Sequence, residues 1–179
     1  DDEVPISWTV EPPVMGIDAA TAADAPLVQD DKPKNLLLDG GVRHGDAASA
    51  FAGCAAVAEG VFETAFVEHA YIEPEAGWAE RVGDRIEIHV TTQTPYMDRD
   101  EIANVMQLRP EAVRIVPTAC GGGFGGKLDL SVQPLVAVAA WQLRRPVACV
   151  YTRPESMAAT TKRHPARVTA KFGCDAEGK

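Results

Sequence analysis

The sequence lacks several features that mark other classes of protein. Its four cysteines show no C-x-x-C spacing, which argues against a zinc ribbon or a cysteine-held iron–sulfur cluster within this chain. No apolar run approaches the roughly 20 residues that a membrane helix needs. Basic residues are scarce, with 17 Lys and Arg against 26 Asp and Glu, and an acidic surface repels phosphate backbones. We therefore expect neither nucleic acid nor a membrane as a partner.

A secretory signal is also missing, so we expect a cytoplasmic protein with reduced thiols. Three of the cysteines are expected in the core, and Cys120 is set apart because it adjoins a glycine-rich loop. The three are Cys54, Cys149 and Cys174. Hydrophobic residues make up 46% of the 179 residues, which suffices for one sizeable core or two small ones.

The N-terminal region shows little periodic pattern. Prolines break it into short extended pieces, which predicts a connecting segment over residues 1–45. Residues 46–179 are expected to form a partial domain. The sequence ends in an alternating strand pattern and the turn signal Asp175–Gly178 with no returning strand, so we expect a fragment of a longer polypeptide.

Hydrophobic periodicity predicts the elements of this domain. Their order over residues 85–174 is strand, helix, strand, loop, helix, strand, helix, strand, which is typical of an α+β or α/β fold. The expected strands are 85–90, 112–118, 147–152 and 168–174, and an earlier one lies within 55–70. One helix is expected to begin near Asp98, with Asp98 and Glu101 at capping-box spacing. The others are 46–53, 132–143 and one capped by Thr152 and Glu155.

The stretch TACGGGFGGKLDL, residues 118–130, places five glycines around Phe124. Bare main chain lets a ligand approach backbone N–H groups closely. Residues Gly121–Lys127 fit the start of a phosphate loop, G-x-x-x-x-G-K, but Leu128 stands where Ser or Thr must hold magnesium. Gly121, Gly123 and Gly126 also fit a dinucleotide pattern, although the expected acidic residue is missing from the end of the next strand. A plain glycine hinge is the third alternative, and a lone aromatic favours a wall against a flat or metal-bearing ligand.

Four ordered motifs resemble the xanthine dehydrogenase and aldehyde oxidase family of molybdenum hydroxylases. They are GGGFGGK at 121–127, the T-Q-T-P segment from residue 91, VEHAYIEPEAGWAE at 67–80, and RRPVACVYTRPESMAATTKRHPARV at 144–168. The resemblance implies an α+β fold of mixed sheets with short packing helices. It also implies that residues 46–179 are part of the molybdopterin-binding subunit.

The resemblance assigns residues to the cofactor. Gln93 takes the position of a glutamine whose amide hydrogen-bonds an oxo ligand on molybdenum. Gly122, Gly123, Phe124 and Gly125 take positions that line the pterin dithiolene and the metal's oxo group, so Gln93 and Phe124 are expected nearest the metal. Phe124 is also expected to shield the centre from water. No catalytic residue is expected here, because the family's catalytic glutamate lies near the far C-terminus of the subunit.

The residue after Gly-Gly-Lys departs from the xanthine-oxidising pattern. Those members carry a purine-binding glutamate there, whereas Leu128 is a hydrocarbon, so an aldehyde or N-heterocycle is the expected substrate. The implied cofactor is molybdenum–molybdopterin, as the plain pterin or its cytosine dinucleotide. The 2Fe-2S clusters and FAD are expected only in partner chains or regions, together with the rest of the molybdenum subunit. A nucleotide-binding enzyme using residues 121–127 and a non-catalytic module sharing the fold are the alternatives.

Overall fold

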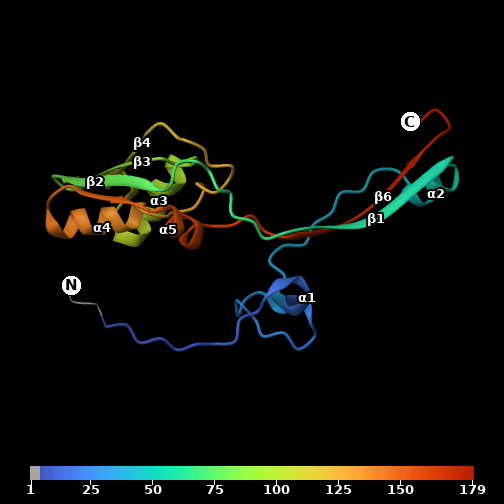
Figure 1. Cartoon of the computed structure of the whole chain (residues 1–179), viewed down its shortest axis with the longest axis horizontal. Helices are drawn as coiled ribbons and strands as arrows, with labels where there is room; N and C mark the ends of the chain where they lie inside the picture. Colours follow the sequence, from blue (N-terminus) through green and yellow to red (C-terminus); the bar gives the residue numbers. More distant parts are fainter. Residues whose placement is uncertain (1–4) are drawn as a thin grey trace. The chain divides into compact units, whose positions relative to one another are not determined.

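The computed structural model describes residues 5–179, which divide into two compact units (Figure 1). One unit, here called the cored unit, is Glu63–Arg167; the other, here called the open unit, comprises residues up to Phe62 together with Val168–Lys179. The expected boundary between residues 45 and 46 stays a prediction. No helix in residues 5–179 is long and apolar enough to cross a membrane.

A four-stranded sheet organises the cored unit. Its strands are β2 Ala76–Val82, β3 Arg85–Val90, β4 Val113–Pro117 and β5 Val147–Val150, in the order β4-β3-β2-β5. The pair β3–β4 is parallel, whereas β2 is antiparallel to both β3 and β5. The sheet is therefore mixed, and the predicted α+β fold class is confirmed.

Helices α3, Pro95–Met106, and α4, Gln133–Leu143, supply the second layer of this unit (Figure 1). Helix α4 packs against β2, β3 and β5, and α3 packs against β4 and α4. Between them lies one apolar core: Ala79, Ile86, Ile88, Val90, Ile102, Ala103, Val113, Val132, Val136, Ala137 and Ala140. The 3-10 turn Pro110–Ala112 leads into β4, and α5, Arg153–Ala159, follows β5.

The predicted start of α3 is wrong. The helix begins at Pro95, whose fixed φ suits the first helical turn, and Thr94 is the N-cap residue. Asp98 therefore lies inside the helix, where it is 1% exposed and accepts a hydrogen bond from Nε2 of Gln133 at 3.2 Å. It does not begin a helix with Glu101, so the expected capping box at this helix is absent.

Two other helix predictions can be checked. At α5, Thr152 Oγ1 accepts the Glu155 N–H, and the Glu155 carboxylate accepts the Thr152 N–H at 2.7 Å, which confirms the capping box. The helix expected over 132–143 is α4, in which Val136 is buried, whereas Leu135 and Leu143 are more than half exposed. The sheet covers a narrower face of α4 than the apolar pattern of the helix implies.

The sequence pattern does not predict the central strand β2. Its sequence AGWAERV mixes small, charged and aromatic residues without a clean alternation. Gly77 explains part of this composition, because a Cβ there would lie 3.1 Å from the His89 carbonyl oxygen on β3.

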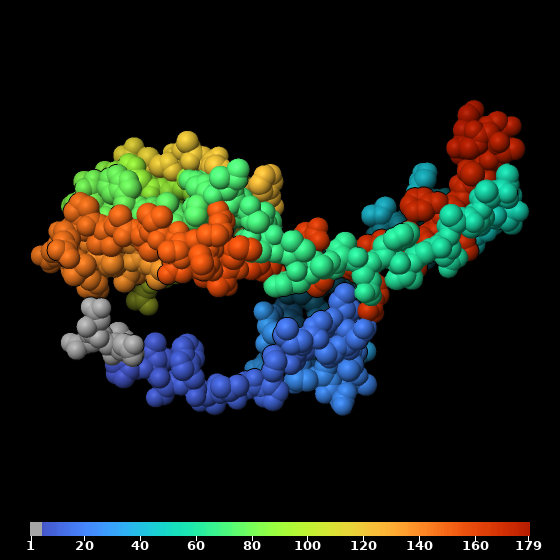
Figure 2. Space-filling view, in the orientation of Figure 1, coloured from blue at the N-terminus to red at the C-terminus, as the bar shows by residue number. Residues whose placement is uncertain are grey.

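The open unit contains a small sheet of its own. Strands β1, Ala56–Thr64, and β6, Ala166–Cys174, form a separate two-stranded sheet, in agreement with the strands expected there. Short elements precede it: α1 Gly16–Thr21, the 3-10 turn Pro33–Asn35 and α2 Ala47–Ala52. Figure 2 shows the paired strands as a narrow ribbon, whereas the cored unit is closely packed.

The cysteines are free, and Cys149 packs against the apolar core. Cys149 is half-buried on β5 at the sheet edge, and Cys54 and Cys174 are half-buried at the separate two-stranded sheet. Cys120, which the sequence sets apart from the other three because it adjoins the glycine-rich loop, is exposed. The expectation of core cysteines is therefore met only by Cys149, in part.

Candidate functional site

The glycine loop leaves the carboxyl end of β4 and leads to α4. Gly122 and Gly125 adopt φ values of 110° and 92°, a region that favours glycine. Phe124 has a φ of 52°, which is uncommon for a residue with a side chain. A hydrogen bond of 2.7 Å from the Gly126 N–H to the Gly123 carbonyl oxygen closes the turn around Phe124.

Gln93 lies against this loop, although 28 residues separate it from Gly121 in the sequence. Strands β3 and β4 are parallel neighbours, so their carboxyl ends meet at one edge of the sheet, and Gln93 follows β3 just as the loop follows β4. The Gln93 N–H donates to the Lys127 carbonyl oxygen at 3.0 Å. The structure thus brings together the two sequence-predicted parts of the site.

The side chain of Gln93 has a fixed orientation. Its Oε1 accepts the N–H groups of Gly125, at 3.1 Å, and Lys127, at 3.3 Å. Two donors facing one atom identify that atom as the amide oxygen, so the NH₂ group points away from both. Within residues 5–179 this NH₂ group donates no hydrogen bond, and Gln93 is exposed.

Three glycines of the loop are required by the protein's own side chains. A Cβ at Gly123 would lie 2.4 Å from Gln93 Oε1, and a Cβ at Gly121 would lie 2.7 Å from Glu73 Cβ. A Cβ at Gly126 would lie 2.8 Å from Tyr71 Cε1. The bare main chain therefore serves packing at these positions, a role that the sequence pattern did not separate from ligand approach.

Three consecutive N–H groups of the loop make no hydrogen bond within the described part of the chain. They belong to Gly122, Gly123 and Phe124, whereas the neighbouring Gly121, Gly125, Gly126 and Lys127 all donate. Successive free backbone donors in a turn with positive φ values form a concave site for anionic or oxo groups. The Phe124 ring is 78% exposed, so its expected shielding role stays a prediction.

Lys127 does not face a ligand. Its side chain is 4% exposed and its Nζ contacts Glu73 Oε2 at 2.8 Å, donates to Thr91 Oγ1 at 3.1 Å and lies 4.8 Å from the centre of the Tyr71 ring. A phosphate loop needs this ammonium group at the phosphates. The arrangement therefore gives the nucleotide alternative no support.

The cluster beneath the loop was missed by pattern analysis. Tyr71 is 1% exposed and donates its hydroxyl to the carboxylate of Glu75, which is 2% exposed. Burial, followed by the hydrogen bond to Glu75, raises the pKa of Tyr71 well above its usual range. The segment that contains Tyr71, Glu73 and Glu75 has no hydrophobic periodicity. Its resemblance to the family was therefore the only sequence feature that pointed to these residues.

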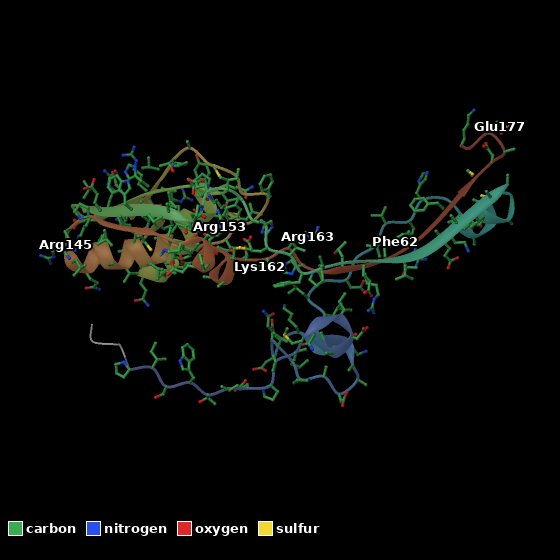
Figure 3. The ribbon with its side chains drawn as sticks, viewed as in Figure 1. Phe62, Arg145, Arg153, Lys162, Arg163 and Glu177 are labelled. Atoms are coloured by element: carbon green, nitrogen blue, oxygen red, sulfur yellow. The ribbon has the colours of Figure 1, made fainter. Side chains whose placement is uncertain are left out.

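Leu128 is half-exposed beside a hollow of about 530 Å³ that Gly125 also borders. His69 and residues 160–164 supply other walls of this hollow. Lys162 and Arg163 belong to it, whereas Arg145 lies at the far end of the unit (Figure 3). Within residues 5–179 no three His, Cys, Asp or Glu side chains form a metal site, so the Glu68–His69 pair has no metal-binding context.

Residues 28–179 match the family model of the molybdopterin cofactor-binding domain. The chain belongs to this family. It is 34% identical over 180 residues to the nicotinate dehydrogenase large molybdopterin subunit of Eubacterium barkeri, an alignment that covers 99% of this chain and 42% of that subunit. It is 36% identical over 142 residues to the xanthine dehydrogenase of Emericella nidulans, which covers 77% of this chain and 10% of that protein.

Solved structures of aldehyde oxidoreductases share the fold. The aldehyde oxidoreductase of Desulfovibrio gigas matches with a TM-score of 0.83 and 30% identity, over 93% of this chain and 18% of that one. The aldehyde oxidoreductase of Desulfovibrio desulfuricans matches with a TM-score of 0.83 and 28% identity, over 95% and 19%. This chain therefore spans less than half the length of these molybdopterin-binding relatives. The predicted family is confirmed.

Proposed function

We propose that the enzyme carrying this chain is a molybdenum hydroxylase and that the glycine loop with Gln93 holds part of its molybdenum cofactor. One observation carries the proposal: three free backbone N–H groups, of Gly122, Gly123 and Phe124, adjoin an amide whose NH₂ group is turned outward. Such uncharged donors suit the oxo and dithiolene groups of the cofactor. Membership in the molybdopterin cofactor-binding family supports the same assignment.

Each residue of the site would have its own role in holding this cofactor. Gln93 would donate through Nε2, and Phe124 would contribute its main-chain N–H and a ring that excludes water. Gly122, Gly123 and Gly125 keep the donors accessible by presenting no side chain. When bound, the cofactor supplies a two-electron oxidation that uses oxygen from water. The molybdenum–molybdopterin is plain or a cytosine dinucleotide, and the catalytic base comes from outside this chain.

The proposed substrate is an aldehyde or an N-heterocycle. Leu128 lines the hollow beside the loop together with Asp129, and it presents a hydrocarbon where the xanthine-oxidising members carry a purine-binding glutamate. The names of two relatives agree with these substrate classes, one acting on nicotinate and one on aldehydes. Electrons would leave through 2Fe-2S and FAD groups in partner chains or regions, and the rest of the molybdenum subunit would complete the pocket. We place this enzyme in the cytoplasm.

Gln93→Glu in the intact enzyme tests the role of the amide. Glutamate keeps an oxygen for the N–H groups of Gly125 and Lys127 but removes the NH₂ donor, so we expect kcat to fall about a hundredfold. Gln142→Glu, on the exposed end of α4, is the matched control and is expected to leave turnover unchanged.

Unchanged turnover of the Gln93→Glu enzyme would contradict the proposed role. A wild-type enzyme that contains no molybdenum or pterin after expression in a competent host would instead support the non-catalytic alternative. Saturable micromolar binding of ATP would support the nucleotide alternative.

A further inference from the structure

Both ends of the glycine loop meet at a single carboxylate oxygen. Glu73 Oε2 accepts the Gly121 N–H at 2.6 Å and the Lys127 ammonium group at 2.8 Å. Gly121 is the first residue of the GGGFGGK motif and Lys127 is the last. The carboxylate therefore ties the first residue of the loop to the last.

The ion pair is shielded from water by its surroundings. The Lys127 side chain is 4% exposed and that of Glu73 is 27% exposed, and the Tyr71 ring lies below the ammonium group. The exposed pair Lys171–Glu59, at 3.1 Å, has side chains that are 45% and 60% exposed. Loss of one partner of a buried pair leaves an uncompensated charge, whereas an exposed pair contributes little.

Lys127 also links the pair to the amide that faces the cofactor. Its N–H donates to Gln93 Oε1 and its carbonyl oxygen accepts the Gln93 N–H. One residue thus connects the Glu73 carboxylate to the side chain and the main chain of Gln93. A shift of Lys127 would move both the loop and the outward amide.

We infer that Glu73 and Lys127 are positioning residues, which hold the loop donors and the Gln93 amide in the arrangement that receives the cofactor. This inference rests on the proposed function for the identity of the bound group. The positioning itself concerns only the chain's own contacts. Neither side chain touches the cofactor in this account.

The test uses the intact enzyme with Lys127→Met, Glu73→Gln and the double substitution. Lys171→Met and Glu59→Gln carry the same chemical changes into the exposed pair and serve as controls. Three quantities are measured: hydrogen exchange of the hydrogen-bonded loop amides of Gly125, Gly126 and Lys127 in cofactor-free protein, molybdenum retained after gel filtration, and the midpoint of urea unfolding.

Each single variant at the buried pair is expected to exchange its loop amides about tenfold faster, equivalent to about 1.4 kcal/mol, and to retain less molybdenum. Each is also expected to unfold at lower urea. The double variant removes the unpaired charge, so its urea midpoint recovers, while the loop still exchanges quickly and still loses molybdenum. The two control variants are expected to match wild type in all three measurements.

Recovery of loop protection and molybdenum in the double variant would overturn the inference, because the pair would then serve only to neutralise charge. Wild-type protection in the single variants would overturn it as well. Failure of the proposed function has a different signature. In that case the wild-type enzyme holds no molybdenum, and the exchange measurement alone decides whether the ion pair positions the loop.

Discussion

The cored unit and the open unit differ in how they hold their apolar side chains. In Glu63–Arg167, eleven hydrophobic residues form one buried cluster between sheet and helices. In the open unit no described residue is buried. There, Trp8 is 81% exposed and Val42 is 98% exposed.

This difference shows which region can position a cofactor by its own packing. Burying a large apolar side chain contributes roughly 1.5–3 kcal/mol, whereas ordering each residue costs about 1–2 kcal/mol. A unit without a fully buried side chain recovers less of that cost through its own packing. The glycine loop belongs to the unit that supplies its own core.

Ile88→Ala should give the largest contrast between the units. Ile88 is fully buried on β3, and its truncation leaves a cavity, so we expect a loss of about 3 kcal/mol in the free energy of unfolding. Ile6→Ala is the matched change in the open unit, where Ile6 is 62% exposed, and we expect an effect within about 0.5 kcal/mol. Urea unfolding measures both, and equal losses would remove the distinction.

Gly123→Ala sharpens the comparison at the loop. Its Cβ would lie 2.4 Å from Gln93 Oε1, so either the loop or the amide must move, at an expected cost of about 2 kcal/mol and with lower molybdenum content. Gly40→Ala in the open unit is the control, because no atom lies within 4 Å of its Cβ. The steric account would be refuted by an alanine at 123 that leaves both stability and metal content intact.

Asp98→Asn should stabilise the cored unit by about 1 kcal/mol at pH 7, because Oδ1 of Asp98 is buried without a partner. Burial raises the pKa of Asp98 above its usual 3.8, so ionisation costs folding free energy as pH rises through that interval. The advantage of the variant should therefore shrink as pH falls towards the usual value. Urea unfolding from pH 4 to pH 7 tests this, and an advantage that grows at low pH would contradict the sign.

Thr152→Ala should have a small effect in the cored unit, similar in size to that of Asp98→Asn and opposite in sign. It removes the cap of α5, at an expected cost of about 1 kcal/mol in urea unfolding. Asp46→Ala removes the cap of α2 in the open unit, where Asp46 accepts the Ser49 N–H at 3.1 Å. Because the open unit adds no core, the main unfolding transition should not shift. A shift as large as that of Thr152→Ala would show that the two units unfold together.

Much of the cored unit follows from local sequence signals. The strand Arg85–Val90 alternates cleanly, and the cap of α5 has its Thr and Glu at capping-box spacing. The start of α3 was misplaced because an acidic residue three positions before Glu101 imitates a cap, whereas tertiary packing buries Asp98. The sequence pattern does not predict strand β2. The composition of this strand reflects its contacts with neighbours on both sides, so it shows no single apolar face.

The candidate site could also be predicted only in part from the sequence. The motif and its family resemblance were enough to choose Gln93 and the loop, which the structure places together. The partners Glu73 and Tyr71 could not be chosen, because their contacts join residues about 50 positions apart and no local pattern encodes such a pairing. The binding roles of Gln93, Gly122, Gly123, Phe124 and Gly125 stay predictions.

A crystal structure of the intact enzyme with its cofactor tests the central claim most directly. The account predicts an oxo or sulfur atom of the molybdenum cofactor within hydrogen-bonding distance of both Gln93 Nε2 and the Phe124 N–H, with Gln93 Oε1 still accepting from Gly125. A cofactor bound away from this loop, or an amide nitrogen turned inward toward the glycines, would contradict it.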